Sequence, residues 1–311
     1  MTRPNVCVVG ASNIDLISYV PRLPNMGETL HGTEFRMGYG GKGANQAVMA
    51  AKLGAVVTMV TKLGKDVFGD GTLENFRACG VDTQFVTVTD EAFSGVAPIM
   101  VDDSGNNSIV IVTGANDLLT DEEIESARPA MASAGALVCQ LEIPVSAVLV
   151  ALRAARAEGT LTVLNPAPAP AHVPDELLVL CDVLCPNQGE AGVLTGRRVD
   201  SVEDAVAAAG ALRERGAGSV VVTLGENGCL VASAAGVEHV PAPSVDAVDT
   251  TGAGDAFVGA LAYFLGKGES LVASSAWANE IAALSVLGRG TQTSFPDRST
   301  LPDPVVQALG P

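Results

Sequence analysis

Ala136-Leu-Val-Cys139 is the first of four short apolar runs, and the others are Leu161-Thr-Val-Leu164, Val183-Leu-Cys185 and Val220-Val-Val-Thr-Leu224. Between them lie stretches with helical periodicity, at Val145–Ala157, Glu190–Leu194 and Val202–Arg215. Short apolar runs that alternate with helices are typical of parallel strands whose connections cover both faces of a sheet. The sequence therefore predicts an α/β fold with a central, mostly parallel sheet and helices on both faces.

The flanking segments extend this pattern at both ends. Further buried strands are expected at Val6–Val9 and Val56–Val60, a strand pair at Cys229–Ala232 and Val237–Val240, and helices at Gly43–Leu53, Phe68–Cys79, about 254–266 and about 269–287. Residues 14–40 alternate only weakly in polarity, as exposed strands do. Residues 83–112 are expected to form several strands, including Val96–Val101 and Ser108–Val112. Since no linker or repeat interrupts the chain, we expect one domain over residues 1–311 with a small β appendage.

Composition narrows the class of function. The chain has 311 residues, of which 48% are apolar, and a formal net charge of −17, which argues against a nucleic-acid surface. It has no apolar run of transmembrane length and no evident signal peptide, so no membrane partner is expected. Six scattered cysteines lack the spacing of a zinc site and indicate a reducing, cytoplasmic setting.

The segment from Asp249 to Asp255 (Asp-Thr-Thr-Gly-Ala-Gly-Asp) precedes the apolar helix and carries the clearest chemical signal. Gly252, Ala253 and Gly254 lie where a loop becomes a helix, so that free backbone N–H groups and the helix dipole favour an anion such as phosphate. Asp255 in the first helical turn is suited to take a proton from a hydroxyl that attacks this phosphate. The alternative is that Asp255 only stabilises the helix start and that the glycines only permit close packing.

Polar residues follow five of the predicted strands. They begin at Gly10, Gln140, Asn165, Pro186 and Thr223, and include Asn13, Asp15, Glu142, Asn187 and Glu190. In an open parallel sheet, ligands bind beyond the carboxyl ends of the strands. One polar strand end is weak evidence, but five in register predict a binding site at this edge.

The stretch Gly38-Tyr-Gly-Gly-Lys-Gly43 matches the dinucleotide pattern G-x-G-x-x-G. The context argues against both nucleotide motifs, because no strong buried strand leads into it and Gly43 stands where a P-loop needs Ser or Thr. We interpret it instead as backbone that approaches a small ligand closely. Asn45, in the helix that follows, is placed to bind a hydroxyl, and Lys42 is placed to serve the ligand or the transferred phosphate.

The chain resembles the ribokinase-like carbohydrate kinase family from Val6 to Pro296. Two stretches are specific, Gly40–Gln46 (Gly-Gly-Lys-Gly-Ala-Asn-Gln) and Asp249–Asp255, and Pro24–Glu28, Gly114–Asn116, Gln140–Glu142 and Asn165–Ala169 support them. The resemblance implies ATP-dependent phosphorylation of D-ribose at its 5-hydroxyl, which yields ribose 5-phosphate and ADP. Asp255 would be the base, and Gly252, Ala253 and Gly254 the anion hole.

The resemblance also implies the remaining site residues. The sugar would contact Asn13, Ile14, Asp15, Gly41, Lys42, Gly43, Ala44, Asn45, Glu142 and Asp255. ATP would contact Asn187, Glu190, Thr223, Leu224, Gly225, Glu226, Asn227, Gly228, Gly254 and Asn279, with Asn187 and Glu190 also placing Mg²⁺. A potassium ion would bind at Asp249, Thr251, Ser285, Gly288, Gly290 and Ser294. Gln188 and Gly189 depart from the commoner, glutamate-containing form of the Asn-x-x-Glu element.

By the same resemblance, segments 14–40 and 91–112 would form a β lid over the sugar and pair two subunits into a homodimer. Kinases for 2-deoxyribose, fructose or a nucleoside are alternatives within the class. Asn13 favours a sugar that keeps its 2-hydroxyl, and the few aromatic residues of the lid (Tyr19, Phe35 and Tyr39) disfavour a nucleoside base. From other classes, a dinucleotide-dependent dehydrogenase and a silent sugar-binding regulator are the competing hypotheses.

Overall fold

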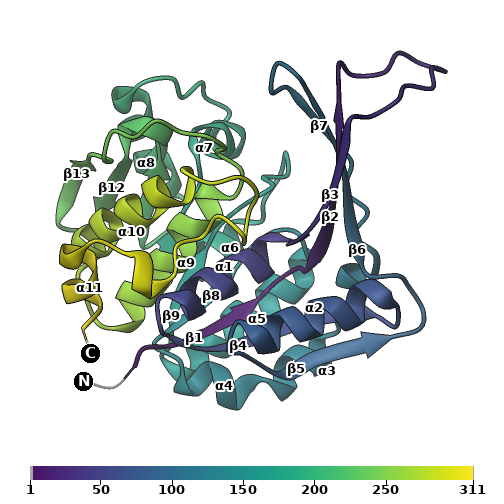
Figure 1. Cartoon of the computed structure of the whole chain (residues 1–311). Helices are drawn as coiled ribbons and strands as arrows, with labels where there is room; N and C mark the ends of the chain where they lie inside the picture. The colour runs from purple at the N-terminus through teal and green to yellow at the C-terminus, as the bar shows by residue number, and fades with distance from the viewer. Residues whose placement is uncertain (1–2, 311) are drawn as a thin grey trace.

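The computed structural model describes residues 3–310, and a nine-stranded sheet forms the centre of the molecule (Figure 1). Its strand order is β13-β12-β11-β10-β9-β8-β1-β4-β5, and β12 alone runs antiparallel to both of its neighbours. The strands are β1 (Asn5–Val9), β4 (Val56–Gly64), β5 (Val81–Thr89), β8 (Ala136–Cys139), β9 (Leu161–Leu164), β10 (Val183–Leu184), β11 (Ser219–Thr223), β12 (Cys229–Ser233) and β13 (Gly236–Val240). The predicted, mostly parallel sheet is confirmed.

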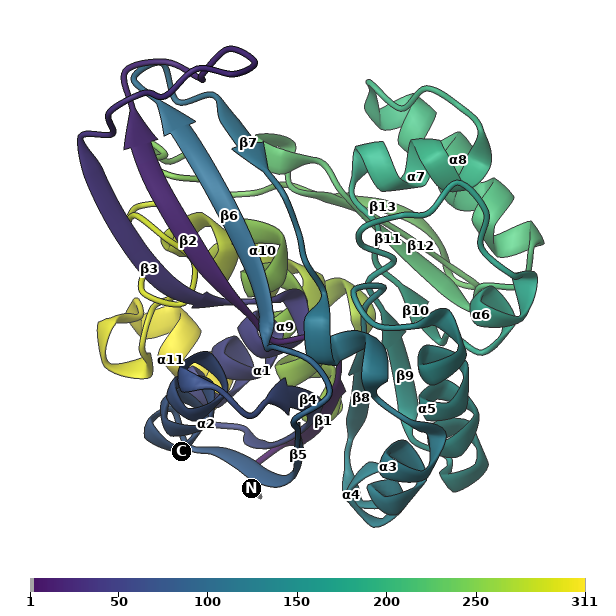
Figure 2. The same cartoon turned by 90° about the vertical axis from the view of Figure 1, so that its right-hand side faces the viewer.

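Helices cover both faces of this sheet, as predicted (Figures 1 and 2). Val6 and Val8 of β1 pack into one apolar core, whereas Cys7 and Val9 pack into the other, because successive strand residues point to opposite faces. The first core involves α1 (Lys42–Lys52), α2 (Val67–Ala78), α9 (Ala253–Gly266), α10 (Leu271–Ser285) and α11 (Asp303–Leu309). The second involves α3 (Asp121–Ser126), α4 (Arg128–Ser133), α5 (Val145–Glu158), α6 (Asp175–Val179), α7 (Gln188–Thr195) and α8 (Val202–Glu214).

A separate four-stranded sheet rises from the body of the molecule and is called the lid sheet below (Figure 2). Its order is β3 (Glu34–Gly40), β2 (Asn13–Val20), β6 (Gly95–Asp102) and β7 (Asn107–Ile109). The strand expected at Ser108–Val112 is wrong in its extent: β7 ends at Ile109, and beyond it Val112 makes a single bridge to Val96. The first of the strands expected within residues 83–112 is β5, at the edge of the large sheet.

Four short helices, α3, α4, α6 and α11, were not predicted from the periodicity. Each has five to seven residues, which is too short for a helical repeat of apolar residues to emerge. For α3 the sequence contains a helix-start pattern, because Thr120 and Glu123 form a capping box at its first turn. Three short 3₁₀ helices complete the described elements, η1 (Gly114–Leu118), η2 (Gly225–Asn227) and η3 (Arg298–Thr300).

Candidate active site

The residues predicted to form an anion hole beside a base lie at the start of α9. Gly252 precedes the helix with φ of 80°, a left-handed conformation that favours glycine, and a Cβ there would lie 2.5 Å from Thr291 Cγ2. Asp255 lies in the first turn and is only 7% exposed. The Ala253 N–H donates to the Thr250 carbonyl oxygen at 3.2 Å, so the N–H groups that follow it in the first turn are the ones left for a phosphate oxygen.

Two side-chain amides hold the carboxylate of Asp255. Asn45 Nδ2 donates to its Oδ2 at 2.8 Å, and Gln46 Nε2 donates to its Oδ1 at 2.9 Å. Gln46 is completely buried, and its Oε1 accepts a 2.6 Å hydrogen bond from Gln140 Nε2. Gln46 Nε2 also donates to Asn165 Oδ1, which leaves the amide of Gln46 a single orientation. Sequence reasoning did not assign this role to Gln46, Gln140 or Asn165.

A second set of amides supports Asn45 from the other side. Gln292 Nε2 donates to Asn45 Oδ1 at 3.0 Å, and Asn75 Nδ2 of α2 donates to Gln292 Oε1 at 2.8 Å. Asn45 therefore has its oxygen bound by Gln292 and its nitrogen directed at Asp255. Together these uncharged amides hold the Asp255 carboxylate in one orientation.

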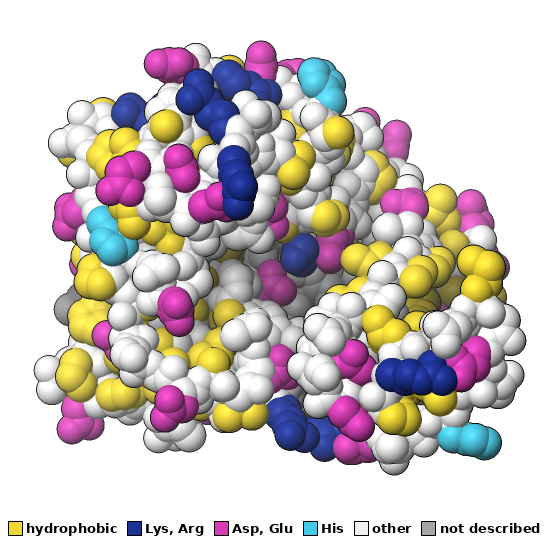
Figure 3. Space-filling view, turned by 90° about the horizontal axis from the view of Figure 1, so that it is seen from above, with side chains coloured by type: hydrophobic (Ala, Val, Ile, Leu, Met, Phe, Trp, Pro, Cys, Tyr) yellow, Lys and Arg dark blue, Asp and Glu magenta, His cyan; other side chains and the backbone are white. Residues whose placement is uncertain are grey.

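A cavity of about 180 Å³ opens next to Asp255, and Figure 3 shows acidic and basic side chains on the floor of a hollow in the same face. The residues that line it include Lys42, Asn187, Glu190, Thr223, Gly252, Gly254 and Asp255. A larger and more open hollow of about 610 Å³ lies along the lid sheet, between Pro24, Thr33 and Met100. The smaller cavity is the candidate active site, because Asp255 and the start of α9 line it.

Lys42 lies among carboxylates in this cleft. The pKa of Lys42 is raised, because the negative charge of Asp255 outweighs the effect of burial. Burial raises the pKa of Glu142, although its Oε2 accepts a 2.8 Å hydrogen bond from the Lys42 backbone N–H. Burial also raises the pKa of Asp15 to about 7, and the nearby charges of Glu142 and Asp255 add to the effect. Asp15, Glu142 and Asp255 therefore lie close enough together for their charges to affect one another.

The loop after β1 and the start of α1 pack closely enough to bring the predicted sugar-binding residues together. Gly41 has φ of 86°, and a Cβ there would lie 2.7 Å from the Asn13 backbone nitrogen. A Cβ at Gly43 would lie 2.7 Å from the Gly10 carbonyl carbon. Ile14 and Ala44 are each only 1% exposed as whole residues, so their side chains pack into the interior.

Asn187 and Glu190 form a capping box at the start of α7. Glu190 N–H donates to Asn187 Oδ1 at 2.8 Å, and Asn187 N–H donates to Glu190 Oε2 at 2.9 Å. Glu190 Oε1 has no hydrogen-bond partner within residues 3–310. Burial raises the pKa of Glu190, as expected for a carboxylate that lacks a full set of partners. This donor set fits a magnesium ion, which prefers carboxylate oxygen.

The predicted nucleotide-binding loop follows β11. Thr223 lines the cavity and bridges to Asn187, while Leu224, Gly225, Glu226, Asn227 and Gly228 form the turn around η2. A Cβ at Gly228 would overlap the Val240 carbonyl oxygen, so this turn needs glycine. Asn279 Nδ2 donates to the carbonyl oxygens of Val240 and Pro241, so Asn279 holds the neighbouring segment in place.

The predicted potassium-binding residues come from two loops that lie together. Asp249 Oδ1 accepts from Thr251 N–H and Oδ2 accepts from Gly290 N–H, both at 2.9 Å. Burial raises the pKa of Asp249, but these hydrogen bonds outweigh it and the pKa lies below its usual value. Ser285 ends α10 with its hydroxyl bonded to the Ala282 carbonyl. Gly288 and Ser294 are also neighbours, since a Cβ at Gly288 would lie 3.2 Å from Ser294 Cβ.

Comparison with known proteins agrees with this geometry. The model of the pfkB family carbohydrate kinases matches residues 3–298. The chain is 46% identical to the ribokinase of Mus musculus, over 96% of this chain and 93% of that protein. It is 41% identical to the deoxyribokinase of Salmonella typhi, over 94% of this chain and 95% of that protein. The Arabidopsis thaliana ribokinase structure, complexed with ribose and ATP, superposes with a TM-score of 0.89 at 32% identity, covering 99% of each chain.

The chain belongs to the pfkB family of carbohydrate kinases. The dehydrogenase hypothesis does not hold, because the Gly38–Gly43 stretch spans the end of β3 in the lid sheet and the start of α1, and no buried strand of the large sheet leads into it. The predictions of the family and of the fold are both confirmed. None of the helices within residues 3–310 is long and apolar enough to cross a membrane.

Proposed function

We propose that this chain transfers the γ-phosphoryl group of ATP to the 5-hydroxyl of D-ribose. The observation that carries the proposal is the buried Asp255 at the start of α9, held by Asn45 and Gln46 beside a cavity that Gly252 and Gly254 also line. The 5-hydroxyl oxygen forms a bond to the γ-phosphorus while the bond to the leaving ADP oxygen breaks. Asp255 accepts the hydroxyl proton, and the first N–H groups of α9 bind the transferred phosphoryl group.

The sugar lies between the lid sheet and the start of α1 in this proposal. Asp15 and Glu142 accept hydrogen bonds from sugar hydroxyls, because carboxylates are strong acceptors. Lys42 carries positive charge toward the phosphoryl group, and its raised pKa keeps it protonated at neutral pH. Asn13 and Asn45 provide amide groups, while Ile14, Gly41, Gly43 and Ala44 contribute backbone atoms.

A 2-deoxyribose kinase is the second candidate, because a protein named deoxyribokinase is 41% identical to this chain. Asn13 distinguishes the two, since a buried amide that loses its hydroxyl partner penalises the 2-deoxy sugar. Asn13 is only 4% exposed, so bulk water reaches it poorly once a sugar fills the cleft. We therefore favour ribose.

Mg²⁺ and K⁺ complete the proposed site. Asn187 and Glu190 would hold the magnesium ion, which when bound neutralises phosphate charge. Asp249, Thr251, Ser285, Gly288, Gly290 and Ser294 would hold potassium, and one carboxylate with neutral oxygen donors suits a monovalent cation. ATP would lie against the loop from Thr223 to Gly228, with Asn279 beside it.

The lid sheet would also join two subunits. Met37 and Phe35 of β3 are 55% and 63% exposed, and they pair with Leu16 and Ser18, so they lie on the face opposite Asp15. An exposed apolar sheet face is a candidate interface. Light scattering should report a dimer that Phe35→Glu converts to a monomer, and a monomeric wild-type protein would contradict this interface.

We also propose that the chain forms one domain and that the protein is cytoplasmic, in line with its six unpaired cysteines.

The test of the function is ADP release with Mg-ATP and a panel of D-ribose, 2-deoxy-D-ribose, D-fructose and a nucleoside. We expect D-ribose to give the highest kcat/KM, and NMR of the product should show phosphorus coupled to the C5 protons. Preference for 2-deoxyribose would support the second candidate. Phosphate on any other carbon would contradict the proposed position of the sugar.

A further inference from the structure

Asn116 in η1 lies directly behind Asn13 and makes contacts that fix its own orientation. It is completely buried, and its Oδ1 accepts the Ser12 backbone N–H at 2.9 Å. Its Nδ2 donates to the carbonyl oxygens of Thr113 at 2.8 Å and Ser12 at 3.1 Å. A backbone N–H can only donate and a carbonyl can only accept, so the amide of Asn116 has one possible orientation.

The orientation of Asn116 then determines that of Asn13. Asn116 Nδ2 donates to Asn13 Oδ1 at 2.9 Å, so the oxygen of the Asn13 amide faces inward. Asn13 Nδ2, on the other side of this amide, has no hydrogen-bond partner among residues 3–310. The fully buried side-chain atoms without a partner in this part of the chain belong to Thr87, Gln140, Ser274 and Ser275, and Asn13 Nδ2 is not among them. Asn13 Nδ2 is therefore accessible and needs a partner.

The free amide nitrogen of Asn13 faces the same side of the lid sheet as Asp15. Asn13 and Asp15 are two residues apart on β2, so their side chains lie on one face. That face points at the cleft, because Glu142 and Asp255 are the charges that act on Asp15. A sugar in the cleft thus meets two N–H donors of Asn13 that have no other partner.

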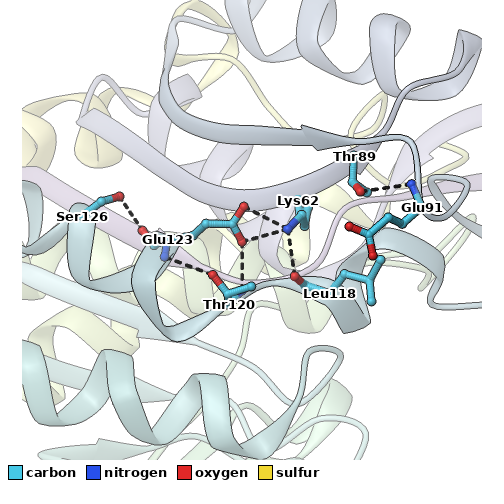
Figure 4. Close-up of polar contacts among 7 residues, drawn as sticks. All are labelled: Lys62, Thr89, Glu91, Leu118, Thr120, Glu123 and Ser126. Atoms are coloured by element: carbon cyan, nitrogen blue, oxygen red, sulfur yellow. Dashed lines mark hydrogen bonds and ion pairs between the residues drawn. The ribbon is translucent and has the colours of Figure 1, made fainter.

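The 3₁₀ helix η1, which carries Asn116, is anchored at its last residue, Leu118, by Lys62 and Glu123 (Figure 4). Lys62 Nζ donates to the Leu118 carbonyl at 2.9 Å and pairs with Glu123 Oε1 at 2.9 Å. Glu123 also forms the capping box with Thr120 at the start of α3. Because this anchor holds η1 against β4, Asn116 cannot readily turn to follow a moving Asn13.

We propose that Asn116 is a positioning residue that sets selectivity for a sugar with a 2-hydroxyl, by locking the amide of Asn13 with its donors toward the cleft. The inference rests on the proposed sugar kinase function. A locked donor binds the oxygen of the 2-hydroxyl, but against a 2-deoxy sugar it stays unpaired and cannot rotate to another acceptor. A free Asn13 would turn away, and the penalty against the 2-deoxy sugar would shrink.

The experiment compares kcat/KM for D-ribose and for 2-deoxy-D-ribose in Asn116→Leu and in wild type. We expect the ribose to deoxyribose ratio to fall about tenfold, because ribose loses a well-placed donor and 2-deoxyribose no longer leaves that donor unpaired; tenfold corresponds to about one buried hydrogen bond. In an Asn13→Leu background, the same Asn116→Leu change should leave the ratio unaltered within about twofold, because Asn116 acts only through Asn13.

Gly95→Ala is the second variant, for the case in which Asn116→Leu does not fold. A Cβ at Gly95 would overlap both Asn13 Oδ1 and Asn116 Nδ2, so alanine separates the pair while both amides remain. We expect the ratio to fall here too. Thr162→Val is the matched control: Thr162 is completely buried and donates to the Leu180 carbonyl at 2.7 Å, in the amino half of β9. It should lower stability and keep the wild-type ratio.

The inference is overturned if both Asn116→Leu and Gly95→Ala reduce activity on the two sugars equally, or if Asn116→Leu lowers the ratio further in the Asn13→Leu background. In these cases the wild-type protein still phosphorylates ribose and the proposed function stands. A wild-type protein that phosphorylates neither sugar would overturn the proposed function and, with it, this inference.

Discussion

Replacing Asp15 by asparagine should stabilise the folded protein in a pH-dependent way while removing sugar binding. The pKa of Asp15 rises from 3.8 to about 7 on folding, chiefly because the carboxyl is buried and then because Glu142 and Asp255 lie near it. Between these values the folded protein binds a proton that the unfolded chain has lost. The contribution of Asp15 to stability therefore falls as the pH rises from about 4 to about 7.

The size of this effect follows from about 1.4 kcal/mol per pKa unit. Asp15 lowers the stability of the folded protein by about 4 kcal/mol at about pH 8, where its carboxylate is ionised, and by about 2 kcal/mol at about pH 5.5, where the folded protein has to bind a proton that the unfolded chain has lost. Asp15→Asn carries no ionisation, so the free energy of unfolding of the variant minus that of wild type should be about 2 kcal/mol larger at the higher pH.

Urea unfolding of both proteins at the two pH values, without sugar, measures this difference. Saturating ribose should then stabilise wild type and leave Asp15→Asn unchanged, because the variant lacks the carboxylate acceptor. A difference in unfolding free energy that is the same at both pH values would refute the reasoning about burial. Stabilisation of the variant by ribose would refute the role of Asp15 in binding.

Three other perturbations probe the site. Gln46→Leu removes one hydrogen-bond donor to Asp255. In steady-state kinetics it should lower kcat about tenfold or more, while KM for ribose changes less than about threefold. A rise in KM with kcat unchanged would count against a positioning role for Gln46. Gly252→Ala puts a Cβ against Thr291 at a left-handed φ and should abolish ADP release, whereas near-normal turnover would show that the loop tolerates the change. Asp249→Asn should weaken activation by potassium over sodium, and an unaltered potassium response would argue against that loop.

Sequence patterns predicted the large sheet well, because burial on both faces leaves continuous apolar runs that any parallel strand must show. The strands at Ala136–Cys139 and Leu161–Leu164 have the predicted bounds. The short helices were missed because tertiary packing stabilises them, and five to seven residues carry little periodic signal. For α3, the capping residues Thr120 and Glu123 indicate the helix better than apolar periodicity does.

The sequence also predicted the charged and glycine-rich parts of the candidate site, since Asp255 and the glycines before it occur in one local motif. It did not predict the network of buried amides around Asp255. Gln46 contacts Gln140 and Asn165, which are 94 and 119 positions away along the chain, and no local pattern shows that a buried amide faces a carboxylate. The contact between Asn13 and Asn116 spans 103 positions and needed the fold in the same way.

The most direct test of Asp255 as the base is the variant Asp255→Asn, which keeps the shape of the side chain and removes its charge. ADP release with Mg-ATP and D-ribose in potassium buffer should fall by about 100- to 10,000-fold, the usual contribution of a positioned base. Calorimetry should show that ribose and ATP still bind within about threefold of wild type. Turnover within about tenfold of wild type would contradict the central role of Asp255.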